Sequence, residues 1–350
     1  MTHFHKLSLF ILAILLTSCN SSAQEKNDYS AKIDSLIVTN TPRPFNGVVL
    51  LTKNGKTLYT KTFGYKNFDT KVPLTEDDQF EIMSNTKQIT SVLILKEVEK
   101  GKINLQDPIK KHLPFLTKTW ADSVTVHQLL NHTHGIIDIE KPLLFKPGSE
   151  FKYGNLSNSL LGKIIENTTK KTYTQVAEEL FKSLKMKNTF CYSKTNKRKL
   201  VSGHMNKSNN FKVVENSFID SDNMAADGVI TTAKDLTIWN KYLHNGKILT
   251  PKSYALMITE SVKSQHDVFG KEKMGYGYNI RIVEENEIKY FGHTGLGDGF
   301  ASLNIYIPKS DISLIILENQ MAENSDLYYY FETLIKEIVL KSKSLNKNFR

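Results

Sequence analysis

The chain has 350 residues, a formal net charge of +10 and two cysteines, Cys19 and Cys191. Its lysines are scattered and form no block of five like charges. A basic face for nucleic acid needs such clustering, so we expect no nucleic-acid partner. The positive charge instead suits a solvated surface that anionic lipid or cell wall could attract. The length fits one large domain or two closely joined ones.

The first residues have the features of an export signal. Lys6 gives a positive start, and the mostly apolar run at 7–16 is too short to span a bilayer. The string Leu-Thr-Ser-Cys at 16–19 resembles the lipobox of bacterial lipoproteins, which implies cleavage before Cys19 and a lipid on its sulfur. A plain secretory signal with an incidental cysteine is the alternative.

This leader sets the expected organisation and location of the chain. We expect a membrane partner through a lipid anchor at Cys19, in the bacterial cell envelope on a periplasmic or cell-surface face. Once Cys19 is acylated, Cys191 has no cysteine left to pair with, so no internal disulfide is expected. The expected parts are a signal peptide at 1–18, a tether at 19–28 and a folded domain at 29–345.

The folded domain is predicted to begin with a helix and a hairpin. Residues 29–38 place apolar side chains on one helical face. Two β-rich runs follow at 47–52 and 57–63, joined by a turn that contains Asn54 and Gly55, and Asn-Gly between such runs is a strong hairpin signal.

Helices dominate the middle of the chain, and strands return after residue 274. An apolar repeat predicts an amphipathic helix over 86–100, which Gly101 ends. The other predicted elements are helices at 156–166, 174–184 and 326–340 and strands at 278–283, 288–291, 300–307 and 312–317. Short turns between the late strands favour antiparallel pairing.

This order predicts an α+β fold. One antiparallel sheet would combine distant segments, at about 45–65 and 275–318, with flanking helices and an inserted, mostly helical part at about 85–270. The sequence shows neither an internal repeat nor a low-complexity tract.

The first candidate for chemistry is Ser84 with Lys87, three residues later. Residues at this spacing share a helical face, so the amine can approach the hydroxyl and take its proton once burial favours the neutral amine. A helix N-terminus also favours a developing oxyanion. The simpler alternative is that Ser84 only caps the helix. The same tetrapeptide pattern recurs at Ser149 and Ser344, without the strand and helix signals around it.

Tyr153 and Asn155 form the second candidate. A tyrosine hydroxyl near the lysine can relay the serine proton to a leaving group, and an asparagine amide can hold both lysine and a substrate carbonyl. Alternatively, Asn155 is a helix cap and Tyr153 a half-buried aromatic residue.

The third candidate is His293-Thr294-Gly295-Leu296, just past the predicted strand at 288–291. Glycine there allows a substrate backbone to lie close to the strand, and the Leu296 N–H could be an oxyanion donor beside that of Ser84. A plain glycine-rich turn is the alternative. A dinucleotide-binding loop is not expected, because a strand follows and not a helix.

Together these motifs resemble the serine β-lactamase and D-Ala-D-Ala peptidase superfamily, specifically its class C-like branch of esterases, peptidases and β-lactamase-related hydrolases. Residues 124–136 resemble the branch's "TIRHLLTHTSGL" stretch, and residues 228–236 its "GGL-S-TA-DL" stretch. The resemblance implies a β-lactamase/transpeptidase-like fold and acyl transfer through a serine ester, without a metal or organic cofactor. The implied roles are nucleophile for Ser84, base for Lys87, proton relay for Tyr153, orienting group for Asn155 and substrate-edge strand for the motif at 293–296.

Two departures from the branch affect the expected substrate. Gly154 stands where serine or alanine is common, which could loosen the turn. His293 stands where penicillin-interacting enzymes usually carry lysine, and histidine is largely neutral near pH 7. We therefore predict a small ester or amide substrate, such as a D-amino-acid peptide of the cell wall, and not efficient β-lactam hydrolysis.

Three other functions remain as alternatives. One is β-lactamase activity, and another is a lipoprotein that binds peptidoglycan peptides without turning them over. A metal enzyme would use His127, His132 and His134 with Asp138, but the further Asp-His pair of the corresponding metallo-hydrolases is missing downstream. The oligomeric state is left open.

Overall fold

The computed structural model describes residues 27–346, apart from 196–198, 265–268, 270–272 and 286. The expected signal peptide at 1–18, Cys19 and nearly all of the expected tether lie outside the described residues. Within the described ranges, no helix has both the length and the apolar composition needed to cross a membrane.

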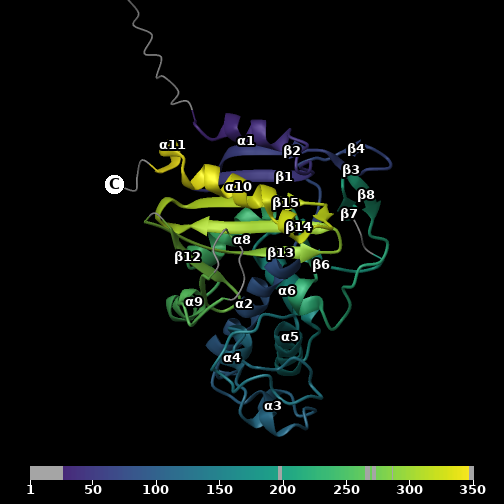
Figure 1. The fold of residues 1–350 in the computed structure, drawn as a ribbon. Coiled ribbons are helices and arrows are strands. Elements are labelled where there is room, and N and C mark those ends of the chain that lie inside the picture. The colour runs from purple at the N-terminus through teal and green to yellow at the C-terminus, as the bar shows by residue number, and fades with distance from the viewer. Residues whose placement is uncertain (1–26, 196–198, 265–268, 270–272, 286, 347–350) are drawn as a thin grey trace, which may run out of the picture.

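The main sheet joins the two ends of the chain (Figure 1). The two ends meet where β1 (Gly47–Lys53) pairs with β15 (Ile312–Glu318), in antiparallel register from Gly47 opposite Glu318 to Lys53 opposite Ile312. β2 (Lys56–Phe63) is the second arm of the predicted hairpin. The turn between β1 and β2 has positive φ at Asn54 and Gly55, as a tight hairpin requires.

Eight strands of the described residues form this sheet, and every neighbouring pair is antiparallel. The α+β fold predicted from the sequence is thereby confirmed. Starting from one edge, the strands before β15 are β10 (Val262–Lys263), β11 (Gly275–Tyr276), β12 (Arg281–Glu285), β13 (Ile288–Gly297) and β14 (Phe300–Ile307), and β1 and β2 follow β15.

Two strand boundaries differ from the prediction. The predicted strand at 278–283 begins only at Arg281, as β12. The predicted strand at 288–291 continues to Gly297, so the motif at 293–296 lies inside β13 and not after it. Glycines normally weaken strands, but β14 pairs with β13 along this whole stretch. The glycines also permit close contact, since a Cβ at Gly295 would lie 2.1 Å from the Ile82 carbonyl oxygen.

The sheet is covered on both faces by helices, and β1 contributes alternately to the two cores. Val49 and Leu51 belong to the cluster that packs against α1 (Ser30–Ile37) and α10 (Tyr330–Leu340). Val48 and Leu50 belong to the larger cluster on the opposite face, with α8 (Ala233–His244) and the helical part of the chain. Figure 1 shows α1 and α10 together on one side and the helical part on the other.

The first helix of the helical part, α2 (Thr86–Glu99), is buried nearly all round and not on one face only. The prediction of an amphipathic helix was therefore wrong. The physical reason is its position, because α5 (Leu156–Thr169), α6 (Tyr173–Ser183) and α7 (Met224–Asp227) pack against it. The turn just before it, at Met83–Asn85, contacts β13 and β14 of the main sheet. Its polar residues Lys87, Gln88 and Ser91 are buried with the apolar ones.

A small sheet links the start of α2 to the chain beyond α7. β5 (Phe80–Glu81) pairs with β9 (Val229–Thr231), which also pairs with β6 (Phe190–Cys191). The 3-10 turn η1 (Met83–Asn85) connects β5 to α2. The remaining elements are β3 (Tyr65–Asn67), β4 (Val72–Pro73), α3 (Ile109–His112), η2 (Thr119–Asp122), α4 (Val126–Leu130), β7 (His204–Lys207), β8 (Asn210–Val213), α9 (Pro251–Ile258), η3 (Pro308–Ser310), β16 (Met321–Ala322), η4 (Ser325–Leu327) and α11 (Lys343–Asn346).

The close contact between α5 and α7 gives a test of the packing. A Cβ at Gly162 of α5 would lie 2.7 Å from the Cβ of Ala225, which cannot swing away because it is fixed to the backbone of α7. We expect Gly162→Ala to lower the free energy of unfolding by about 1 kcal/mol, because overpacking outweighs the gain in helix propensity. Urea denaturation followed by circular dichroism measures this change.

Gly154 provides the matched control, because a Cβ there meets nothing within 4 Å. Gly154→Ala should leave the stability unchanged or raise it by about 0.5 kcal/mol. A Gly162→Ala variant that is more stable than the wild type would contradict the close packing of α5 on α7.

Candidate active site

Ser84 lies in the η1 turn directly before α2, and its hydroxyl does not act as a helix cap. Asn85 is the N-cap of α2 and makes no side-chain capping bond. The Ser84 Oγ instead donates to Asp227 Oδ1 at 3.0 Å and accepts from Lys87 Nζ at 2.7 Å. Met83, the preceding residue, has a φ of 48°, a left-handed conformation that is uncommon for methionine. The turn thus presents Ser84 to a polar cluster.

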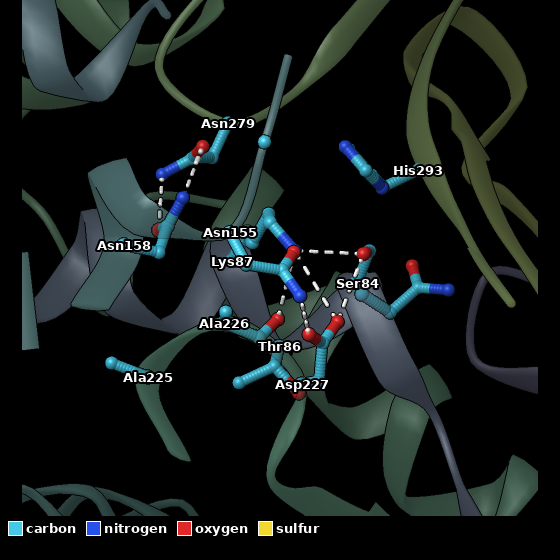
Figure 2. Close-up of polar contacts among 12 residues, drawn as sticks. Ser84, Thr86, Lys87, Asn155, Asn158, Ala225, Ala226, Asp227, Asn279 and His293 are labelled. Carbon is cyan, nitrogen blue, oxygen red and sulfur yellow. Dashed lines mark hydrogen bonds and ion pairs between the residues drawn. The ribbon is translucent and has the colours of Figure 1, made fainter. Parts of the chain in front are cut away.

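Lys87 is the centre of this cluster and is fully buried (Figure 2). Besides Ser84, its Nζ donates to Asn155 Oδ1 at 2.9 Å and to the Ala226 carbonyl oxygen at 3.1 Å, and it lies 3.3 Å from Asp227 Oδ1. A buried ammonium needs this kind of compensation, because desolvation of an unpaired charge is very unfavourable.

Asp227 is a site residue that the sequence analysis missed. It is 2% exposed, and its Oδ2 accepts a hydrogen bond of 2.5 Å from Asn155 Nδ2. The antiparallel register of β5 and β9 explains its place: Phe80 lies opposite Thr231 and Glu81 opposite Ile230. The Ile82 N–H then donates to the Val229 carbonyl oxygen at 3.0 Å, so the turns that hold Ser84 and Asp227 lie next to each other. Only a prediction of this pairing could have found it.

Asn155 and Tyr153 come from the loop that leads into α5. Asn155 is the N-cap of α5 but makes no side-chain capping bond, since its amide bridges Lys87 and Asp227. The Tyr153 ring centroid lies 5.3 Å from Lys87 Nζ and 5.9 Å from the ring of His293, which it faces at an interplanar angle of 29°. The structure therefore brings both residues of the second motif to Lys87.

His293 lies in β13 and is fully buried. Its Nδ1 is 2.6 Å from the Thr294 carbonyl oxygen, which can only accept, so Nδ1 carries the proton. Nε2 then accepts from the Tyr276 hydroxyl at 3.1 Å. Desolvation, followed by the charge of Arg281, holds the pKa of His293 well below its usual value. The ring is neutral, and both its nitrogens are bonded within the protein.

The rest of the third motif forms the strand edge beside the serine. β12 pairs with β13 only as far as Gly292, and the contact between β13 and η1 follows at Gly295. Thr294 is buried, whereas Leu296 is partly exposed and lies opposite Ala301 of β14. The predicted oxyanion role of the Leu296 N–H stays a prediction.

Arg281 is a second residue that the sequence analysis missed. It is 3% exposed, and its guanidinium carbon lies 5.7 Å from the centre of the Tyr153 ring and 5.9 Å from that of Tyr276. Its Nε and Nη1 are buried without a hydrogen-bond partner among the described residues. The sequence analysis expected little positive charge at the site because it considered His293 alone. Arg281 adds a positive charge next to His293, because the pairing of β12 with β13 places Arg281 opposite Gly292.

A buried polar network lies next to Lys87 in Figure 2. Asn279 Nδ2 donates to Ser91 Oγ on α2 and to Asn158 Oδ1 on α5, at 2.8 and 2.9 Å. Asn279 Oδ1 lies 3.0 Å from His132 Nε2. These bonds connect α2, which carries Lys87, with α5, which begins directly after Asn155. They therefore fix the distance between Lys87 and Asn155.

The histidines of the metal alternative have other partners. His127 Nδ1 lies 2.7 Å from the Tyr278 hydroxyl, and His134 Nδ1 accepts from the Ile136 N–H at 2.9 Å. His132 bonds Asn279 and Ser157, and the partly exposed Asp138 lies 3.4 Å from Lys141 Nζ. Across the described residues, no three side chains of the metal-binding types gather in one place.

Comparisons with known proteins place the chain among β-lactamase-related proteins. A family model described as Beta-lactamase matches residues 43–333. Protein flp of Staphylococcus aureus strain MW2 is 28% identical over 325 residues, covering 85% of this chain and 64% of that protein. The chain thus spans less than two thirds of the length of this curated relative.

Two solved structures extend the comparison. The octameric penicillin-binding protein homologue from Pyrococcus abyssi has a TM-score of 0.77 at 25% identity, covering 91% of this chain and 78% of that one. D-amino acid amidase from Ochrobactrum anthropi SV3, in complex with L-phenylalanine amide, has a TM-score of 0.75 at 21% identity, covering 92% and 100%. At 21% identity, the second likeness is one of fold.

The buried histidines predict a dependence of stability on pH. Desolvation lowers the pKa of His134 from 6.5 to about 4. Between these values the unfolded chain binds the proton and the folded chain does not, so stability falls as the pH falls below the unfolded value. From about pH 7 to pH 5, His134 should account for a loss of roughly 2 kcal/mol in the free energy of unfolding.

His134→Asn tests this prediction, because its Oδ1 can accept the Ile136 N–H in place of Nδ1. Urea denaturation at both pH values should show a smaller loss for the variant than for the wild type. Equal losses would mean that His134 titrates normally in the folded protein.

Proposed function

This chain belongs to the Beta-lactamase family of serine hydrolases, and we propose that it catalyses acyl transfer to Ser84 followed by hydrolysis of the acyl-serine. One observation carries the proposal: the Ser84 Oγ lies between Lys87 Nζ at 2.7 Å and Asp227 Oδ1 at 3.0 Å. A cation and an anion both within hydrogen-bonding distance of one hydroxyl suit proton transfer. A protein that only binds peptides has no need for this arrangement.

The neighbouring groups supply the rest of the reaction. The Ser84 Oγ attacks the carbonyl carbon of an ester or amide, and the Ser84 and Leu296 N–H groups stabilise the oxyanion. Tyr153, beside Lys87, relays a proton to the leaving group. Water then hydrolyses the serine ester. The β13 strand edge from Thr294 to Leu296 holds the substrate, and the class C-like branch of the family is the one we favour.

We favour a small ester or amide as the substrate, with a D-amino-acid peptide of the cell wall as the leading natural candidate. The similarity to a D-amino acid amidase supports an amide substrate. The neutral, internally bonded His293 supports a substrate that does not depend on a cation at this position. Arg281 favours β-lactamase activity as a second candidate, because its buried guanidinium keeps a positive charge near Tyr153.

A fluorophosphonate probe and p-nitrophenyl acetate test the proposal directly. The wild type should gain one probe mass on Ser84 and hydrolyse the ester. Ser84→Ala should lose the label and at least about a 1000-fold factor in kcat, since the nucleophile is removed. Intact-protein mass spectrometry and absorbance of the released nitrophenol give the two readouts.

Ser149→Ala is the matched control, because Ser149 also precedes a lysine by three residues but is exposed and donates to the Lys146 carbonyl oxygen. This variant should keep full labelling and activity. If the wild type takes up no probe and Ser84→Ala hydrolyses the ester normally, the serine hydrolase proposal fails. D-peptide amides and nitrocefin, assayed in parallel, separate amidase from β-lactamase activity.

We also propose that Cys19 carries a lipid that anchors the protein in the cell envelope. The sequence at 16–19, after the apolar run, supports this. In cells fed a labelled fatty acid, the wild type should incorporate label and sediment with membranes, whereas Cys19→Ser should do neither. Equal labelling of both proteins would contradict an anchor at Cys19.

A further inference from the structure

The hydrogen bonds around Ser84 raise the question of which group takes its proton. Lys87 Nζ has four neighbours, and each offers it an acceptor: Ser84 Oγ, Asn155 Oδ1, the Ala226 carbonyl oxygen and Asp227 Oδ1. An ammonium group has three hydrogens for these acceptors, whereas a neutral amine has two and a lone pair that finds almost no donor. The surroundings therefore favour charged Lys87, which cannot act as a base.

The surroundings of Asp227 show the opposite character. Its Oδ1 receives hydrogens from Ser84 and Lys87, and its Oδ2 receives one from Asn155 Nδ2. All three partners donate to the carboxyl group, which favours the ionised form with its acceptor-only oxygens. The side chains of Lys87 and Asp227 are 0% and 3% exposed, so this is a buried ion pair with the nucleophile attached to it.

We propose that Asp227 is a catalytic residue, the general base that accepts the proton of Ser84, and that Lys87 acts as a fixed cation. This assignment rests on the proposed function and revises the role of base that the family resemblance implies for Lys87. It follows from the direct contact of Asp227 Oδ1 with Ser84 Oγ, the reacting atom.

The proposed acylation step balances as follows. The Ser84 O–H bond breaks, its proton moves to Asp227 Oδ1, and the electron pair left on Oγ forms the bond to the substrate carbonyl carbon. The bond from that carbon to the leaving group then breaks, and the proton held by Asp227 passes through the Tyr153 hydroxyl to the leaving group. Lys87 stays protonated and stabilises the negative charge that develops on Oγ.

Hydrolysis of the acyl-serine uses the same carboxylate. A water molecule gives one proton to Asp227 Oδ1 while its oxygen bonds to the acyl carbon. When the ester bond breaks, Ser84 Oγ takes that proton, and Asp227 is again ionised. No oxidant or further reactant is needed.

Asp227→Asn tests this inference, with p-nitrophenyl acetate hydrolysis measured from about pH 5 to about pH 10. The wild-type rate should fall on the acid side, because general-base catalysis requires the carboxylate form of the base. The variant should lose about 100-fold to 10,000-fold in kcat, the usual contribution of a general base. Its residual rate should lack the acid limb.

Asp235→Asn is the matched control, because Asp235 is equally buried and accepts from the Asn188 N–H and the Thr189 hydroxyl, away from Ser84. This variant should keep the wild-type pH profile. A purely structural role for Asp227 would lower the rate equally at all pH values. That result, or a kcat of Asp227→Asn within about 3-fold of the wild type, would overturn the inference.

Removing one partner of a buried ion pair can unfold a protein, so a second variant is needed. Asp227→Glu keeps a carboxylate, and circular dichroism checks that each variant is folded. We expect Asp227→Glu to keep the acid limb and to be more active than Asp227→Asn. A folded Asp227→Glu variant without an acid limb would contradict the role of Asp227 as general base. Ser84→Ala separates the two levels: its inactivity supports the proposed hydrolase even if Asp227 proves not to be the base.

Discussion

The burial of the Lys87 amine is the constraint on which the site depends. A fully desolvated charge is tolerated only where the fold supplies acceptors from several directions. Here they come from η1, the N-terminus of α5 and the end of α7, three segments far apart in the sequence. Ser84 and Asn155 supply two of these acceptors, so the bonds that compensate the Lys87 amine also orient their side chains. The compensation of the buried Lys87 amine and the position of the Ser84 hydroxyl therefore have one physical cause.

The fold meets this constraint through backbone register and not through flexible side chains. The β5–β9 pairing brings the turns that hold Ser84 and Asp227 together, and the Ile82 N–H donates to the Val229 carbonyl oxygen at 3.0 Å to continue the pairing towards the site. Gly295 lets β13 come within contact of the chain at Ile82 and Met83. A site positioned by strands and tightly packed helices needs little reorganisation during a reaction.

The positive charge near the β13 strand edge comes from Arg281 and not from a residue on the strand itself. The His293 ring is neutral and is bonded on both sides within the protein, while Arg281 keeps its charge behind Tyr153 and Tyr276. In the proposed function, substrate choice depends on how far the field of a buried guanidinium reaches, and not on a lysine at the strand. This distinguishes the site electrostatically from the penicillin-interacting enzymes that the sequence resembles.

The sequence by itself determined the α+β fold, the hairpin at Asn54-Gly55 and the grouping of Ser84, Lys87, Tyr153 and Asn155, because these follow from local periodicity, turn chemistry and motif order. It misjudged α2 as amphipathic and ended β13 too early, since the burial of α2 and the pairing of Gly295 depend on distant segments. Asp227 and Arg281 were decided by tertiary structure alone. Asp227 reaches the site because β5 pairs with β9, a strand far away in the sequence, whereas Arg281 depends on where the local hairpin of β12 and β13 begins. Local periodicity reveals neither a pairing between distant segments nor the first residue of a strand.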